Sequence, residues 1–525
     1  MTGTGRLIRL ILRRDRVVLP LWVVLLGLVP AGYVASFEGL FPTEAERIDY
    51  AQASAGNAGF VTLYGPLHGS SLGELVAWRA GFQPVLVALC ALLMVVRHTR
   101  TDEEAGRTEL IGAAAVGRHA QLAAALITTC AASVLLGAVV TAAMLGQGLP
   151  AAGSLAFGAE MALAGCVFAG VGAVTAQLTS SARGARTIAL IVLAAAYVLR
   201  VGGDVSALGD GSLAWLSRLS PIGWVQHLFP YGVNDWWPAL LALAVTVVTT
   251  GVAGLLLTRR DFGGGLLPAR LGPASAPAGL GTPLGLAWRL HRGLLLGWVV
   301  GFALLGLVFG GVGGSVLDIA SENSGLGEIF ARLGGSEALV DSYFAGIAGI
   351  VGLIAACYAV QATLRLRDEE QTGHAEATLS TAVSRYAWAG AHLFFSLLGP
   401  AVVLAVEGVA VALAYPQGDF GEILGGTLVQ LPAVWVLAAL AVVAFGLLPR
   451  LSAVAWAPPA LCLLILLVGQ TLQLDQWLLD ISPFTHTPKL PGGDLSPTPL
   501  ITLTVVAAAL TAVGILGVRR RNIPD

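Results

Sequence analysis

Charge is scarce in this sequence. Asp, Glu, Lys and Arg make up 11% of its 525 residues, whereas soluble domains carry about 25%. Lysine is almost absent, because Lys489 is the single lysine among 29 basic residues. A phosphate-binding P-loop requires a Gly-x-x-x-x-Gly-Lys-Ser/Thr segment, and Lys489 stands between Pro488 and Leu490. We therefore expect no ATP hydrolysis by this sequence.

The basic residues are spread along the chain instead of forming a patch, and the formal net charge is -2. This distribution argues against a nucleic-acid partner. The five cysteines lack the spacing of metal sites. Each falls within a long apolar run, where it is expected to pack as a small apolar residue; they are Cys90, Cys130, Cys166, Cys357 and Cys462. The sequence predicts no metal or cofactor bound by this chain.

Long apolar runs are abundant, since 56% of the residues are hydrophobic. A helix needs roughly 20 apolar residues to cross a membrane, and long runs without alternation indicate helices. They predict an all-α polytopic membrane protein with twelve spans, at 17–36, 77–97, 119–146, 151–178, 185–203, 236–258, 294–315, 343–364, 387–415, 424–447, 451–472 and 498–518. Six spans per half return the chain to its starting side, so we expect two parallel six-helix repeats.

One polar segment occurs twice between these runs. The segment at 102–118 reads DEEAGRTELIGAAAVGR, and the one at 369–385 reads EEQTGHAEATLSTAVSR. At a fixed offset of 267 residues, four charged or turn-forming positions recur: Glu103, Gly106, Glu109 and Arg118 match Glu370, Gly373, Glu376 and Arg385. The chain is therefore a duplication, and its two halves carry similar polar loops.

The amino terminus has the pattern of a helix lying on a membrane surface. At about 100° per residue, four arginines share one arc; they are Arg6, Arg9, Arg13 and Arg16. The opposite side holds Leu7, Ile8, Ile11 and Leu12. This pattern predicts an interfacial amphipathic helix in contact with membrane lipid.

The sequence also predicts domain boundaries and an orientation. Residues 263–284 are rich in Gly and Pro and are expected to link a first half, 1–262, to a second half, 285–525. Most arginines fall on the side of the membrane that holds the amino terminus. The positive-inside rule then places both termini and both polar loops in the cytoplasm.

The repeated pattern Glu-x-x-Gly-x-x-Glu, followed by Ala-Val-x-Arg, resembles the cytoplasmic loop between the second and third spans of type-2 ATP-binding cassette (ABC) permeases. In that family the loop docks on an ATP-hydrolysing subunit. The double-length form resembles permeases that export polyketide antibiotics and other drugs from bacteria. The chain departs from the family at Ala115 and Ala382, where Pro is frequent.

This resemblance implies an export permease in a bacterial plasma membrane that moves hydrophobic or amphipathic compounds by alternating access. The partner would be a separate ABC ATPase in two copies, and ATP and Mg would bind to that partner. Coupling would pass through the eight recurring loop residues. Charge reversal at Glu103 or Glu370 is then expected to uncouple transport and to leave the protein inserted.

An ion-gradient-driven transporter is the alternative, because it needs ionisable groups within the bundle. Glu160 and Glu407 fall within predicted spans, and Gln83 and Gln361 are weaker candidates of the same kind. All four are candidate residues of a substrate cavity; a carboxyl that merely packs between helices is the structural alternative.

A membrane-embedded enzyme acting on lipid-linked substrates is the third possibility. It would need converging acids in the outer loops. Asp204, Asp210, Asp235 and Asp341 are the acids found there, and such scattered acids are usually only solvated.

Overall fold

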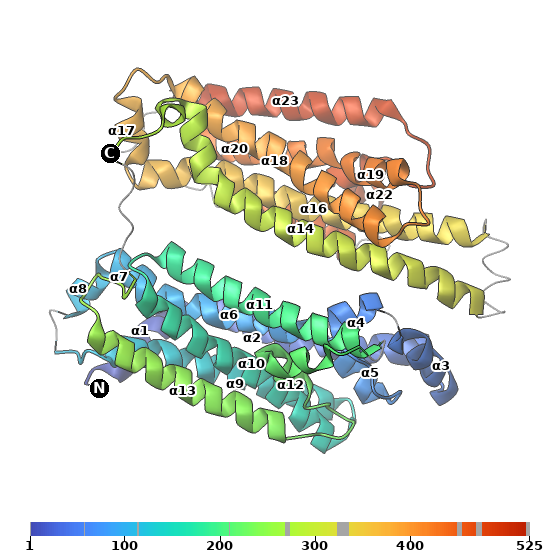
Figure 1. Ribbon diagram of the computed structural model, residues 1–525. Helices are drawn as coiled ribbons and strands as arrows, with labels where there is room; N and C mark the ends of the chain where they lie inside the picture. Colours follow the sequence, from blue (N-terminus) through green and yellow to red (C-terminus); the bar gives the residue numbers. More distant parts are fainter. Residues whose placement is uncertain are drawn as a thin grey trace. The chain divides into compact units, whose positions relative to one another are not determined.

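The computed structural model describes residues 2–56, 58–112, 115–208, 211–267, 274–322, 335–448, 454–468 and 475–520. Within these ranges all regular secondary structure is helical. The chain divides into two compact units, residues 1–272 and 273–525, and the division falls inside the 263–284 segment that the sequence marks as a linker. Each unit is described by itself (Figure 1).

Unit 1 contains six long helices and several short ones. The long helices are α2 (Val18–Leu40), α6 (Gln83–Val96), α9 (Ala120–Gly146), α10 (Ala151–Leu178), α11 (Ala182–Leu208) and α13 (Trp237–Arg259). The shorter helices are α1 (Thr4–Arg14), α3 (Glu44–Ala55), α4 (Ala58–Tyr64), α5 (Leu72–Arg79), α7 (Asp102–Glu104), α8 (Arg107–Gly112), the 3-10 helix η2 (Ala214–Leu219) and α12 (Pro221–Gln226).

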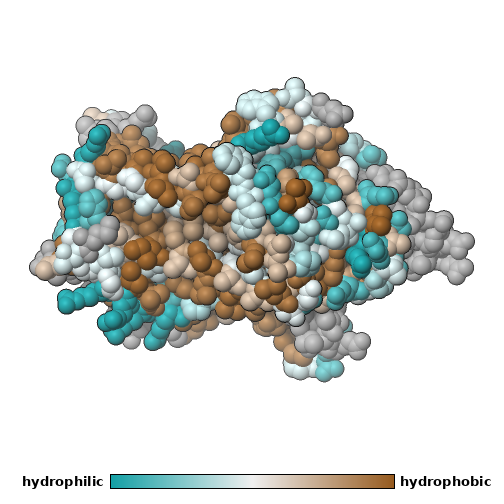
Figure 2. Space-filling view, turned by 90° about the horizontal axis from the view of Figure 1, so that it is seen from below, coloured by the Kyte–Doolittle hydropathy of each residue, from teal (hydrophilic) through white to brown (hydrophobic). Residues whose placement is uncertain are grey.

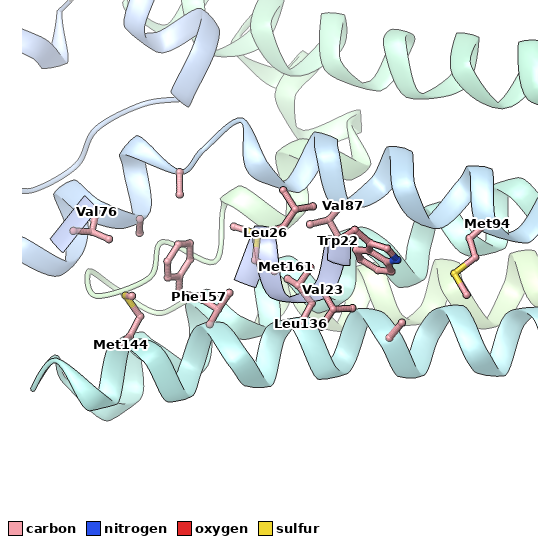
Figure 3. Packing of buried hydrophobic residues seen from close by; sticks show 14 of the residues in the cluster. Trp22, Val23, Leu26, Val76, Val87, Met94, Leu136, Met144, Phe157 and Met161 are labelled. Carbon is pink, nitrogen blue, oxygen red and sulfur yellow. The ribbon is translucent and has the colours of Figure 1, made fainter. Parts of the chain in front are cut away.

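Helix α10 lies at the centre of unit 1, where it packs against α6, α9 and α13. Glycines permit its closest approach to α9, because a Cβ on Gly137 would lie 2.3 Å from the Gly158 carbonyl oxygen. A core of fully buried side chains, among them Leu136 and Phe157, fills the space between α2, α6, α9 and α10 (Figure 3). Helix α1 packs across α9.

Unit 2 repeats this arrangement. Its helices are α14 (Pro283–Glu322), α16 (Gly335–Gln371), α17 (His374–Leu379), α18 (Arg385–Ala414), α19 (Phe420–Leu428), α20 (Leu431–Leu447), α21 (Ala457–Val468), α22 (Gln476–Leu479) and α23 (Pro497–Arg520), with 3-10 helices at Ala278–Gly281 and Pro483–His486. Helix α20 packs against α16, α18 and α23, and α14 packs against α18. In unit 1 the corresponding pairs are α10 with α6, α9 and α13, and α2 with α9.

Eleven helices of the described residues are long and apolar enough to cross a membrane, and a shorter apolar helix lies at 454–466, within the predicted span 451–472. The all-α polytopic class is thereby confirmed. Hydrophobic residues cover much of the middle of the face shown in Figure 2, and hydrophilic residues gather toward its ends.

Several predicted spans differ from the structure. The span at 424–447 is divided, because α19 ends at Leu428 and α20 begins at Leu431. Among its described residues, the span at 451–472 holds only the shorter helix at 454–466. The predicted span at 77–97 begins at Gln83 in the structure, because a turn at 80–82 separates helix α5 from helix α6. The predicted span at 294–315 lies within α14, which begins at Pro283 and is a single helix of 40 residues.

Candidate functional site

The repeated polar loop forms a helix, a glycine turn and a short second helix in both units. In unit 1, α6 continues through one π-helical turn (Arg97–Thr101) into α7, the chain turns at Gly106, and α8 follows. In unit 2, α16 runs to Gln371, the chain turns at Gly373, and α17 follows. Gly106 has φ +70° and Gly373 has φ +74°. Only glycine adopts this left-handed conformation without strain, which accounts for the recurrence of glycine at both positions.

In unit 1 the loop is tied to its surroundings through Glu103, whose side chain is only 5% exposed. Its carboxylate accepts hydrogen bonds of 2.6 and 2.7 Å from the Arg260 guanidinium and one of 2.8 Å from the Gly263 amide. Arg100 lies 3.2 Å away and also donates to the Ala176 and Gly264 carbonyls. Glu103 therefore joins α7 to the end of α13 and is not presented to a docking protein in this structure.

A pair of acidic and basic side chains bridges the glycine turn in both units. Asp102 pairs at 2.8 Å with Arg107, and Glu369 lies 3.9 Å from His374. These two pairs occupy matching positions at the 267-residue offset. Asp102 also forms two hydrogen bonds, of 2.8 and 3.0 Å, with Arg14 at the end of α1.

Arg118 and Arg385 bind the last helix of their own unit. Arg118 donates hydrogen bonds of 2.9 and 3.0 Å to the Leu257 and Arg260 carbonyls at the end of α13. Arg385 donates one of 3.4 Å to the Arg519 carbonyl at the end of α23. A cation at a helix C-terminus stabilises carbonyls that have no partner within the helix. Both arginines therefore position the loop.

Glu109 and Glu376 are presented outward. Glu109 lies on α8, Glu376 lies on α17, and both side chains are exposed. Ala375, next to Glu376, is 1% exposed and anchors α17 in a small core with Trp388 and Leu393. Glu370 is half-buried. Of the eight predicted coupling residues, Glu109 and Glu376 are thus the acids best placed for a partner.

The amino-terminal helix α1 buries Leu7 and Ile11 and exposes Arg6, Arg9 and Arg13. The prediction for Arg16 was wrong, because α1 ends at Arg14 and Arg16 lies in the turn that precedes α2. The cause is a buried acid that the sequence reasoning missed. Asp15 forms an ion pair of 3.0 Å with Arg97 and contacts the buried ring of His98.

Three further residues near the polar loop of unit 1 make contacts that the sequence did not predict. Arg14, Arg260 and Gln177 join elements far apart in the chain, and Gln177 accepts a hydrogen bond of 2.7 Å from Arg260. One signal was available for Asp15: it is the only acid before Glu38. No comparable signal marked Gln177, whose role depends on the tertiary packing.

Of the four predicted cavity residues, Gln83 and Glu160 lie in unit 1, and Gln361 and Glu407 lie in unit 2. Gln83 donates to the Leu26 carbonyl of α2, and Gln361 is exposed and accepts a hydrogen bond of 3.1 Å from Trp298. Glu407 is 0% exposed in α18, and its carboxyl has no hydrogen-bond partner among the described residues. It adjoins a cavity of about 10 Å³, which leaves room for no more than about one water molecule.

Glu160 lies in a different setting, at the end of unit 1 opposite the polar loop. It is 3% exposed in α10 and lines a cavity of about 230 Å³ together with the polar side chains His68, Glu74, Asp204, Gln226 and His227. Burial lowers the pKa of His68, and the nearby His227 lowers it further. His68 is therefore neutral at pH 7. Despite these side chains, no group of three metal-ligating residues occurs in the described part of the chain.

Two units with a common helix order, eleven membrane-length helices and an outward polar loop in each define a duplicated membrane transport protein. The description of the matching family model is "Multidrug efflux system permease Rv1217c, C-terminal domain", and it matches residues 7–259 and 280–519. The chain belongs to this family of permeases. It is 43% identical to the multidrug efflux system permease protein Rv1217c of Mycobacterium tuberculosis (strain ATCC 25618 / H37Rv) over 529 residues, which cover 99% of this chain and 95% of that protein.

Proposed function

We propose that this chain is the permease of an ATP-driven ABC exporter and that a separate ATPase, in two copies, docks on α8 and α17. The observation that carries the proposal is the exposed glutamate on a short helix after a left-handed glycine, present once in each unit. The sequence has a single lysine, outside any P-loop pattern, so ATP and Mg are assigned to the partner. Membership of a multidrug efflux permease family supports export of drug-like compounds.

The loops offer a route by which docking could move the transmembrane helices. In unit 1, α8 is joined through α7 to α6, Glu103 fastens α7 to the end of α13, and Arg118 fastens the start of α9 to the same end. A displacement of α8 would therefore move α6, α9 and α13 together. In unit 2, α17 follows α16 directly. Alternating access would result if closure of the ATPase pair displaced both short helices.

The proposal includes an orientation in a bacterial plasma membrane. Both termini and both loops would face the cytoplasm, because the arginines concentrate on that side. The exposed arginines Arg6, Arg9 and Arg13 of α1 would then meet the anionic lipid headgroups of the inner leaflet. The transported compound would be hydrophobic or amphipathic.

The docking role is tested by charge reversal at the exposed acids. Glu109→Arg, Glu376→Arg and the double variant would each be coexpressed with a candidate ABC ATPase. Each single variant should weaken copurification, and the double variant should lower substrate-stimulated ATP turnover in liposomes at least fivefold. Asp49→Arg is the matched control, because Asp49 is exposed on α3 at the opposite end of unit 1. Full turnover in the double variant would contradict the docking assignment.

A gradient-driven carrier is the second candidate, and the buried carboxyls Glu160 and Glu407 are the observation that favours it. Ionisable groups inside a membrane bundle commonly mark proton or ion pathways. Liposomes that contain only this chain distinguish the two functions. Accumulation of a drug under an imposed proton or sodium gradient, with no ATPase present, would support the carrier and overturn the ABC assignment.

A further inference from the structure

The cavity beside Glu160 has two buried acceptor groups with no donor. The Glu160 side chain is only 3% exposed. Its carboxyl forms no hydrogen bond or ion pair with the described residues of the chain. Gln226 donates through Nε2 to the Gly81 carbonyl at 2.6 Å and to the Tyr64 carbonyl at 3.4 Å. These bonds fix the orientation of the amide and leave its buried Oε1 without a partner.

A buried acceptor without a hydrogen-bond donor destabilises the fold. Glu160 lines the cavity, so an occupant that satisfies its carboxylate must carry N–H or O–H donors. The other acids of the lining are already engaged. Asp204 lies 3.7 Å from Arg200, and Glu74 accepts a hydrogen bond of 2.7 Å from Ser71 in the N-terminal cap of α5. Glu160 is therefore the acid of this lining that has neither a cation nor a hydrogen-bond donor, and a cationic occupant would stabilise its ionised form.

Aromatic rings complete the lining. Tyr64, Trp78 and Phe229 border the cavity, and the ring of Tyr64 already carries the Arg79 guanidinium 4.7 Å from its centre. The indole N–H of Trp78 donates to the Gly65 carbonyl at 2.9 Å, so its ring offers only an apolar and π surface. Aromatic faces attract organic cations. The nearby imidazole of His68 is neutral at pH 7 and does not repel a positive charge.

We propose that this cavity binds the protonated amine of an organic ammonium compound through the Glu160 carboxylate. The proposal rests on the export function, because the amine would be the headgroup of a transported compound. A cavity of about 230 Å³ accommodates an ammonium group with a small apolar substituent, whereas the space of about 10 Å³ beside Glu407 does not.

The test compares benzylammonium with benzyl alcohol, which has nearly the same shape but no positive charge. Binding to the full chain in lipid nanodiscs would be measured by isothermal titration calorimetry without ATPase or nucleotide. We expect benzylammonium to bind at least tenfold more tightly than benzyl alcohol. Glu160→Gln should abolish this preference, and Glu160→Asp should retain part of it because it keeps the charge.

Glu407→Gln is the matched control, since it also neutralises a buried carboxyl but adjoins no cavity of this size. It should leave the preference unchanged. Thermal unfolding of Glu160→Gln checks that the variant is folded. Absence of benzylammonium binding, equal binding of both probes, or an unchanged preference in Glu160→Gln would overturn the proposal. The assay contains no ATPase, so these outcomes are independent of the docking experiment.

Discussion

The polar loop has the same turn in both halves but different attachments. In the first half, Asp102 binds Arg14 of α1, and Glu103 binds Arg260 at the end of α13. In the second half, Glu369 pairs with Arg365 of its own helix at 3.0 Å and with His374 just beyond the turn. The glycine turn is thus common to both copies, whereas the acid that precedes it, Asp102 or Glu369, has different partners in each.

The polar contacts at the start of the first long helix also differ between the two units. In unit 1 the chain bends at Asp15, which binds Arg97 and His98. In unit 2, α14 is continuous, and the position 276 residues later is His291, whose Nε2 lies 3.0 Å from Nδ1 of the buried His392. An acid that pairs with neighbouring cations is therefore replaced by an imidazole pair between α14 and α18. The duplication kept the helix order and changed the polar contacts.

Removal of Glu103 is expected to have the largest effect on stability, because Glu103 attaches the loop of unit 1 to the end of α13. Glu103→Ala would leave Arg100 and Arg260 without their carboxylate, and breaking a buried ion pair costs about 3–5 kcal/mol. Chemical unfolding of the purified protein should show this loss in stability. Glu109→Ala, an exposed change in the same loop, should alter stability by less than about 0.5 kcal/mol. Equal stability of the two variants would show that the Glu103 cluster does not hold the loop.

The turn glycines test what the loops share. Gly106→Ala and Gly373→Ala should each cost about 1–2 kcal/mol, because an L-residue is strained at positive φ. An added Cβ meets no atom within 4 Å at either glycine, so the strain comes from the backbone alone. Gly390→Ala within α18 is the control, and it should be neutral or stabilising. A large difference between Gly106→Ala and Gly373→Ala would contradict the equivalence of the turns.

The helix-end arginines should give the smallest effects. Arg118→Ala and Arg385→Ala should each lower stability by about 0.3–1 kcal/mol, because each loses a cation at a helix C-terminus. Arg118→Ala should lie near the upper limit, since Arg118 makes two such hydrogen bonds of 2.9 and 3.0 Å. Hydrogen exchange at the ends of α13 and α23 provides the measurement. Unchanged exchange in Arg118→Ala would contradict this role.

Hydropathy predicted the membrane helices because each span must be apolar over most of its length, whatever its neighbours are. It did not predict α3 and α4, which are short and lie outside the apolar runs, or the separation of α5 from α6. The helix start at Pro283 was also missed, because Arg289 and His291 interrupt the apolar pattern before Trp298. Polar residues near a helix end do not prevent the helix from forming.

The loop motif predicted the turn but not the buried contacts. Glycine at positive φ is a local requirement, so Gly106 and Gly373 could be recognised from spacing alone. The partner of Glu103 is 157 residues away in the sequence, and only the tertiary fold of unit 1 brings the two together. Arg200, near the end of the predicted span 185–203, is 0% exposed and donates a hydrogen bond of 2.8 Å to the Val61 carbonyl. A basic residue next to a loop can therefore be structural.

The start of the Gly-rich connector belongs to unit 1. The Gly263 amide binds Glu103, and the amides of Leu266 and Leu267 donate to the Gln177 and Leu178 carbonyls. If the gene were split to make two half-length polypeptides, a break before Gly263 would remove part of the fastening of the first loop. A break after Leu267 would keep these bonds within one polypeptide. Unit 1 therefore extends downstream of the point where the composition changes.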